Sequence, residues 1–155
     1  MPDTARVAFR LALLTIVVIV LLAGCGGGGS SARLSKSEFD AKANAICDKY
    51  TKRINGVTAP KGLKDIPHYV DKVLPILREG TSKLDDLKPP SDLQATTDQW
   101  RQILHDEVKQ AEALKQAADK GDTAQVLRIV SETSSKNKRG NALAAQLGAQ
   151  TCAKD

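Results

Sequence analysis

The chain has 155 residues, of which 23 are Lys or Arg and 18 are Asp or Glu, giving a formal net charge of +5. The first 24 residues contain two of the arginines and one aspartate, so the remainder has a mild net charge of +4. About 120 residues are enough for one hydrophobic core and exclude two.

The first predicted element is a secretory signal peptide at residues 1–24. Arg6 and Arg10 precede an uncharged apolar run from Leu11 to Ala23. This run is shorter than the roughly 20 apolar residues that cross a bilayer. A basic segment, a short apolar segment and small residues, in that order, are typical of a signal peptide. An uncleaved anchor and cleavage at a chance cysteine are the alternatives.

The end of this segment, Leu22-Ala23-Gly24-Cys25, resembles the lipobox of bacterial lipoproteins. The resemblance implies cleavage before Cys25, a diacylglycerol thioether on its sulfur and often a further acyl chain on the new amino terminus. Two or three acyl chains hold a protein on a membrane durably. We therefore expect the membrane to be a partner through this lipid anchor, and the protein to lie on the extracytoplasmic face of the cell membrane.

Residues 25–35 are predicted to be the lipidated cysteine and a flexible tether, since the sequence "GGGGSS" offers nothing that could form a core. Residues 36–155 are predicted to form the folded domain. Their apolar residues recur at intervals of three and four, which indicates helices, and alternation at period two is nowhere sustained. The four apolar stripes run from Phe39 to Ile54, Val70 to Leu87, Leu93 to Ala118 and Val126 to Leu147.

Local signals mark the ends and the weak points of these helices. Pro75 is expected to kink or split the second helix, because it removes a backbone donor. The fourth stripe includes Leu127 and Val130, and its middle, "SSKNKRGN", is expected to fray. Capping boxes are predicted at Ser35 with Glu38, Ser91 with Gln94 and Asp122 with Gln125. Four such helices with short links predict an all-α fold, an antiparallel four-helix up-and-down bundle.

The three cysteines are predicted to separate into an anchor and a pair. Acylation of Cys25 leaves Cys47 and Cys152, an even number in a compartment outside the reducing cytosol. In an up-and-down bundle the fourth helix returns the C-terminus towards the start of the first, so we expect a disulfide between them. A buried free Cys47 with a dangling Cys152 is the alternative.

The sequence contains no recognisable catalytic constellation. Neither His68 nor His105 has a second histidine at a helical spacing of three or four, as paired-histidine metal motifs require. The serines of "SETSS" lack a glycine elbow and a base, and no glycine-rich phosphate loop follows a strand. We therefore expect no enzymatic activity, no metal and no cofactor.

One charge cluster stands out, formed by Lys136, Lys138 and Arg139. It could contact anionic lipid headgroups or an anionic wall polymer, although an ordinary solvated helix face is the favoured interpretation. Nucleic acid is not expected as a partner, because no aromatic residues are interleaved with these charges.

Four stretches, "FDAKANAIC", "LKPPSDL", "KGDTAQ" and "LGAQTC", together resemble a group of small helical lipoproteins of actinobacteria. The resemblance supplies no activity. We expect a non-enzymatic interaction or envelope-structure module, with an envelope protein as its partner. The alternative is a carrier that holds a small apolar ligand in the bundle core, which requires spare volume beside small residues such as Ala111, Ala118, Ala144 and Ala145.

Overall fold

The protein is seen here in a computed structural model that describes residues 32–154. The long helices of this part are α2 (Lys36–Asn55), α3 (Ile66–Asp85), α4 (Gln94–Asp119) and α5 (Thr123–Gln146), with 3₁₀ helices η1 (Leu63–Asp65) before α3 and η2 (Ser91–Leu93) before α4. No strand occurs in the described range, so the predicted all-α fold is confirmed. The predicted signal peptide and Cys25 lie outside the described residues.

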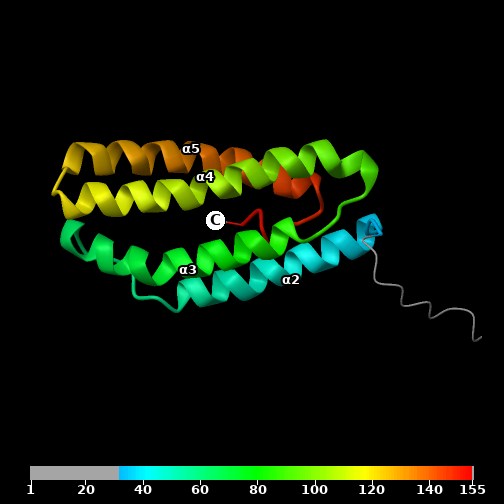
Figure 1. Ribbon diagram of the computed structural model, residues 1–155, viewed down its shortest axis with the longest axis horizontal. Helices are drawn as coiled ribbons and strands as arrows, with labels where there is room; N and C mark the ends of the chain where they lie inside the picture. Colours follow the sequence, from blue (N-terminus) through cyan, green and yellow to red (C-terminus); the bar gives the residue numbers. More distant parts are fainter. Residues whose placement is uncertain (1–31, 155) are drawn as a thin grey trace, which may run out of the picture. The chain divides into compact units, whose positions relative to one another are not determined.

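Consecutive helices run in opposite directions, which makes an up-and-down arrangement (Figure 1). The contacts between α4 and α5 follow this arrangement, since Thr133 meets Gln110 and Lys136, further along α5, meets Asp106, earlier in α4. The closest packing is between α4 and α5 and between α3 and α4, followed by α2 with α3. Within the described residues α2 and α5 make no comparably extensive contact, so one edge of the bundle is more open than the others.

The buried core falls into two clusters at opposite ends of the bundle. The larger contains Phe39, Trp100 and Leu147, from the beginnings of α2 and α4 and the residue after α5. The smaller contains Ala118 and Ile129, from the end of α4 and the beginning of α5. The middle of the bundle therefore lies between two packed ends.

Helices α3 and α5 are both continuous through the segments that were expected to interrupt them. Helix α3 continues through Pro75 without a break, and the Pro75 side chain is exposed. The expected fraying of "SSKNKRGN" is wrong, since α5 is helical throughout. Gly140 explains this, because it is buried and a Cβ there would meet Ile103 Cγ2 at 3.2 Å. The missing side chain lets α5 lie close against α4.

The start of α4 and the buried face of α5 also differ from expectation. The capping box at Ser35 is present in full. At Asp122 one of the two expected bonds is present, in which the backbone N–H of Gln125 donates to the Asp122 carboxylate. Ser91 instead begins η2, and α4 starts without a side-chain cap. In α5 the predicted core residues Leu127 and Val130 are 65% and 52% exposed, because the stripe that meets α4 passes through Val126 and Ile129.

The folded domain begins earlier than the predicted boundary after Ser35. The Leu34 amide donates to the Lys88 carbonyl over 2.9 Å, and Arg33 Nη1 donates to the Pro89 carbonyl over 2.9 Å. The carbonyls of Lys88 and Pro89 lie in a loop whose prolines have no N–H to offer, so they need donors from elsewhere. The part of the predicted tether that contains Arg33 and Leu34 is thus bound to the helical domain.

The C-terminal segment folds back onto α2 and carries the disulfide. Gly148 turns the chain with a φ of 82°. Its carbonyl accepts from Asn44 Nδ2 over 3.1 Å, and Asn44 Oδ1 accepts from the Thr151 amide over 2.6 Å. The Sγ atoms of Cys47 and Cys152 are 2.10 Å apart, which is the predicted pair at bonding distance. This segment covers the Phe39 end of the bundle.

Replacing Gly148 by alanine should be more harmful than replacing Gly121, which also has a positive φ. Both substitutions force a left-handed backbone on a residue with a Cβ, which costs about 1 kcal/mol. At Gly121 the Cβ meets nothing within 4 Å, whereas at Gly148 it would overlap the Asp40 carboxylate. We expect losses in the free energy of unfolding of about 1 kcal/mol for Gly121→Ala and about 3 kcal/mol for Gly148→Ala. Urea unfolding checks this, and equal losses would contradict it.

Candidate ligand-binding site

Two hollows meet in the middle of the bundle, between the two core clusters. The inner hollow, of about 130 Å³, lies between α2, α3 and α4, and Cys47 and Leu104 are among its walls. The outer hollow, of about 310 Å³, is lined from all four long helices. Three residues line both hollows: Ile54, Leu77 and Glu107.

The openness between α2 and α5 explains why this space exists. The C-terminal segment fills the gap between these helices at the Phe39 end, and among residues 32–154 no other segment covers the middle of the bundle to the same extent. Ala111 lines the outer hollow, where a larger side chain would reduce the volume. Ala118 and Ala144 are buried in the core clusters, and Ala145 is exposed. Of the small residues considered from sequence, only Ala111 therefore borders the hollows.

Glu107 is the polar centre of this site. It is half-buried on α4, and burial raises the pKa of its carboxyl from the ordinary 4.5 to about 7. With its amide nitrogen turned inward, Asn137 donates to Glu107 Oε1 over 3.2 Å and to the Thr133 carbonyl over 3.0 Å. No Lys, Arg or His is among the described residues that line either hollow. The carboxyl thus lies in a largely apolar setting without an opposite charge in the walls.

Sequence reasoning missed Glu107, although a signal was present. The apolar stripe of α4 passes through Leu104, Val108 and Ala111, and Glu107, three residues after Leu104 and four before Ala111, lies beside Val108 on the same face. A carboxyl at a position that faces the core must lose its water or find a partner. The spacing of Glu107 from Leu104 and Ala111, two residues of the stripe, was the feature to notice.

Tyr50 fixes the wall of the inner hollow on the α2 side. Its hydroxyl donates to Glu79 Oε1 over 2.7 Å, and Arg53 Nη1 donates to Glu79 Oε2 over 2.6 Å. The bond to Glu79 raises the pKa of Tyr50, and the bond from Arg53 lowers the pKa of Glu79. The Tyr50 ring lies against Gly80, where a Cβ would meet its Cγ at 3.1 Å. Tyr50 therefore lines the inner hollow, while its hydroxyl is already hydrogen-bonded to Glu79.

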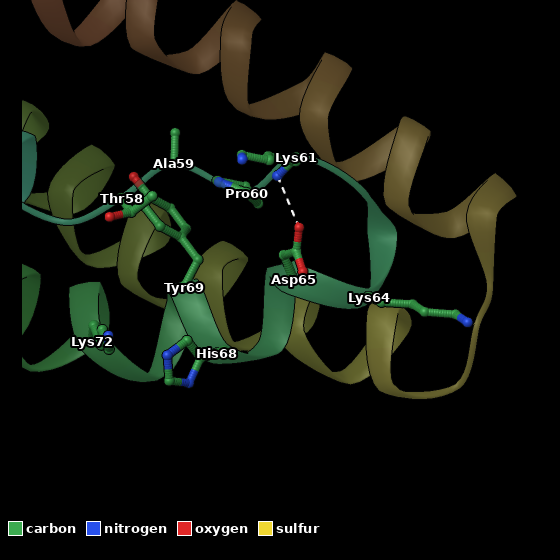
Figure 2. Close-up of a pocket in the computed structure, with 9 residues that line it drawn as sticks. All are labelled: Thr58, Ala59, Pro60, Lys61, Lys64, Asp65, His68, Tyr69 and Lys72. Carbon is green, nitrogen blue, oxygen red and sulfur yellow. Dashed lines mark hydrogen bonds between the residues drawn. The ribbon is translucent and has the colours of Figure 1, made fainter.

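A larger hollow, of about 520 Å³, lies beside the loop between α2 and α3 (Figure 2). Figure 2 shows the Tyr69 ring reaching towards Thr58, while the Lys64 side chain points away from the other residues. The one hydrogen bond drawn joins the Lys61 amide to Asp65 Oδ2 over 3.0 Å. Because its charged groups do not converge on one point, this hollow is a weaker candidate than the site at Glu107.

The structure separates the three residues of the predicted basic cluster. Lys136 and Arg139 border one surface hollow together with Asp106, and Lys136 Nζ is 3.6 Å from Asp106 Oδ2. Lys138 borders a different hollow, next to Val130. Residues two apart on a helix point to different sides. Lys136 and Lys138 therefore border different hollows, and contact of the cluster with an anionic surface stays a prediction.

The histidines lie apart from the Glu107 site. His105 Nε2 is 3.1 Å from Asp85 Oδ2 on the surface, and His68 borders the loop hollow. Across residues 32–154 no three potential ligands are grouped closely enough to hold a metal ion. None of the helices described is long and apolar enough to cross a membrane.

Comparison of the chain with protein-family models, with curated proteins and with solved structures found no match.

Proposed function

We propose that this protein is a non-enzymatic binding protein, anchored by lipid to the extracytoplasmic face of the cell membrane, whose bundle holds a small and mainly apolar ligand beside Glu107. The observation that carries this proposal is the pair of hollows lined from four helices in the middle of the bundle. Binding sites of helical bundles are built from facing helices in this way. The outer hollow, at about 310 Å³, is at the lower end of the usual range for ligand pockets, roughly 300–1,000 Å³.

The binding site is tested by filling it. We expect Ala111→Phe to abolish binding, because the added ring occupies the outer hollow. Ala142→Phe on the exposed face of α5 is the matched control and should bind as the natural chain does. Native mass spectrometry of the full-length protein, extracted in mild detergent, would detect a small molecule bound to the control and lost from Ala111→Phe. Identical spectra for the two variants would contradict the proposed site.

The anchor is tested at Cys25. We expect Cys25→Ser to abolish metabolic labelling with a fatty acid, because the cysteine sulfur is the atom that the lipobox resemblance says is acylated. A double variant, Cys47→Ser with Cys152→Ser, is the control and should still be labelled. Labelling of Cys25→Ser, or no labelling of the natural chain, would show that Cys25 is not the anchor.

A second candidate function is an interaction module for an envelope protein. It is favoured by the exposed apolar side chains of Leu127 and Val130 on α5. Single exposed apolar residues are common, so this observation is weaker than the hollows. The same mass spectra separate the two functions, because a protein partner without a small molecule would favour the module.

A further inference from the structure

We propose that the ligand of the Glu107 site is an amphipathic amine, whose ammonium group pairs with the Glu107 carboxylate while its apolar part occupies the adjoining hollow. This inference rests on the proposed function, because it names the ligand class of the same site. It follows from the charges, the shape and the protonation of the site.

The first argument is the charge of the walls. A carboxylate removed from water is costly unless a cation or several donors compensate it. The residues that line the two hollows around Glu107 are apolar or uncharged on every helix, and they include Tyr50 on α2, Tyr69 on α3, Gln110 on α4, and Thr133 and Asn137 on α5. None of these carries a positive charge. A cationic ligand supplies the charge that the walls lack, whereas an anionic ligand would be repelled.

The nearby cations of α5 are directed elsewhere. Lys136 pairs with Asp106, whose neighbouring position on α4 points away from Glu107. Lys138 borders the separate surface hollow next to Val130. On α2, Arg53 is held by Glu79 over 2.6 Å. The ligand's own ammonium group is therefore the cation that the geometry of the site leaves for Glu107.

The second argument is the shape of the site. Glu107 lies where the two hollows meet, so a molecule bound to its carboxylate can extend into either of them. The inner hollow, at about 130 Å³, is close to the roughly 150 Å³ that holds benzene in a protein core. Tyr69 is among the residues that line the outer hollow, and aromatic rings attract a cation that lies close to them. A single ring or short alkyl chain with one amine fits this arrangement.

The third argument gives a dependence on pH. The pKa of Glu107 is about 7, because burial disfavours the charged carboxylate. Below pH 7 the carboxyl is mostly protonated and must lose its proton before it can pair with an ammonium group. We therefore expect affinity for an amine to fall about tenfold per pH unit below 7 and to level off above it. Affinity for an uncharged molecule of the same shape should not change in this range.

Benzylamine and benzyl alcohol are suitable probes, because they share one ring and differ in charge. Their dissociation constants are measured by NMR titration of the full-length protein in detergent at pH 6 and pH 8. At pH 8 we expect benzylamine to bind about tenfold more tightly than benzyl alcohol, since bonds to charged groups are the stronger ones. Glu107→Gln should abolish this difference. The control Glu132→Gln, at an exposed position on α5, should retain it.

A second measurement needs no variant of Glu107. The ¹³C shift of its carboxyl reports its titration, and saturating benzylamine should lower its pKa by at least about one unit. Equal binding of the two probes, or an unmoved pKa, would overturn the amine assignment and leave the ligand-binding hollow in place. Binding of neither probe, together with spectra in which Ala111→Phe and its control are identical, would overturn the hollow as a ligand site as well.

Discussion

Loss of the disulfide between Cys47 and Cys152 should lower the free energy of unfolding by about 4 to 5 kcal/mol. The bond closes a loop with a sequence separation of 105 residues, for which the chain-entropy model gives roughly 4.7 kcal/mol. It also holds a segment in which Leu147 and Ala149 are completely buried. A domain with one Trp and few other aromatic side chains depends more strongly on such a cross-link.

The measurement is urea unfolding of the natural chain, oxidised and reduced, beside the double variant Cys47→Ala with Cys152→Ala. Reduction and substitution should lower the unfolding midpoint by similar amounts. Asn44→Ala is the matched control, because it removes the hydrogen bonds to Gly148 and Thr151 but leaves the disulfide, and it should cost only about 1 to 2 kcal/mol. Two free thiols in the denatured, unreduced protein lacking Cys25 would contradict the bond itself.

At pH 8, Glu107→Gln should be more stable than the natural chain by on the order of 3 kcal/mol. Burial raises the pKa of Glu107 from 4.5 to about 7 in the folded state. Below pH 4.5 the carboxyl is protonated in both states and costs nothing. Between pH 4.5 and 7 the unfolded chain ionises first, so stability falls as the pH rises. Above pH 7 the loss is complete, and each unit of pKa difference corresponds to about 1.4 kcal/mol.

Glutamine keeps the shape of the side chain and carries no charge, so Glu107→Gln should escape this loss. Urea unfolding at pH 4, 6 and 8 should therefore show no difference at pH 4 and a growing advantage for the variant at higher pH. Glu132→Gln changes an exposed carboxylate and should track the natural chain at all three values. A constant difference between Glu107→Gln and the natural chain across this range would contradict a buried carboxyl with a raised pKa.

Several features of the fold could be predicted from sequence because their causes are local. The four helices follow from apolar spacing, which depends on residues three and four apart. The capping box at Ser35 needs only Glu38, which is one turn away. The pairing of Cys47 with Cys152 followed from counting cysteines once Cys25 was assigned to the anchor. That anchor lies before the described residues, so its acylation stays a prediction.

Other features were decided by contacts between segments that are distant in sequence. Ile129 rather than Val130 is buried, because the angle at which α5 meets α4 selects one of two neighbouring stripes. Leu34 is bound by the carbonyl of Lys88, a donor and acceptor pair that no local pattern connects. In each case the contact that forms depends on which surface of another segment lies opposite the residue. The sequence of a single segment does not contain that information.

The sequence by itself determined that this protein has four amphipathic helices and two cysteines placed to pair, and it predicts an N-terminal segment of the lipoprotein type. Only the tertiary structure decided that α2 and α5 stay apart in the middle of the bundle and that Glu107 lies in the space between them. The physical reason is that helix formation is governed by neighbours along the chain, whereas a hollow is the volume that four separate helices together fail to fill. The burial of Glu107 and its raised pKa are properties of that shared volume.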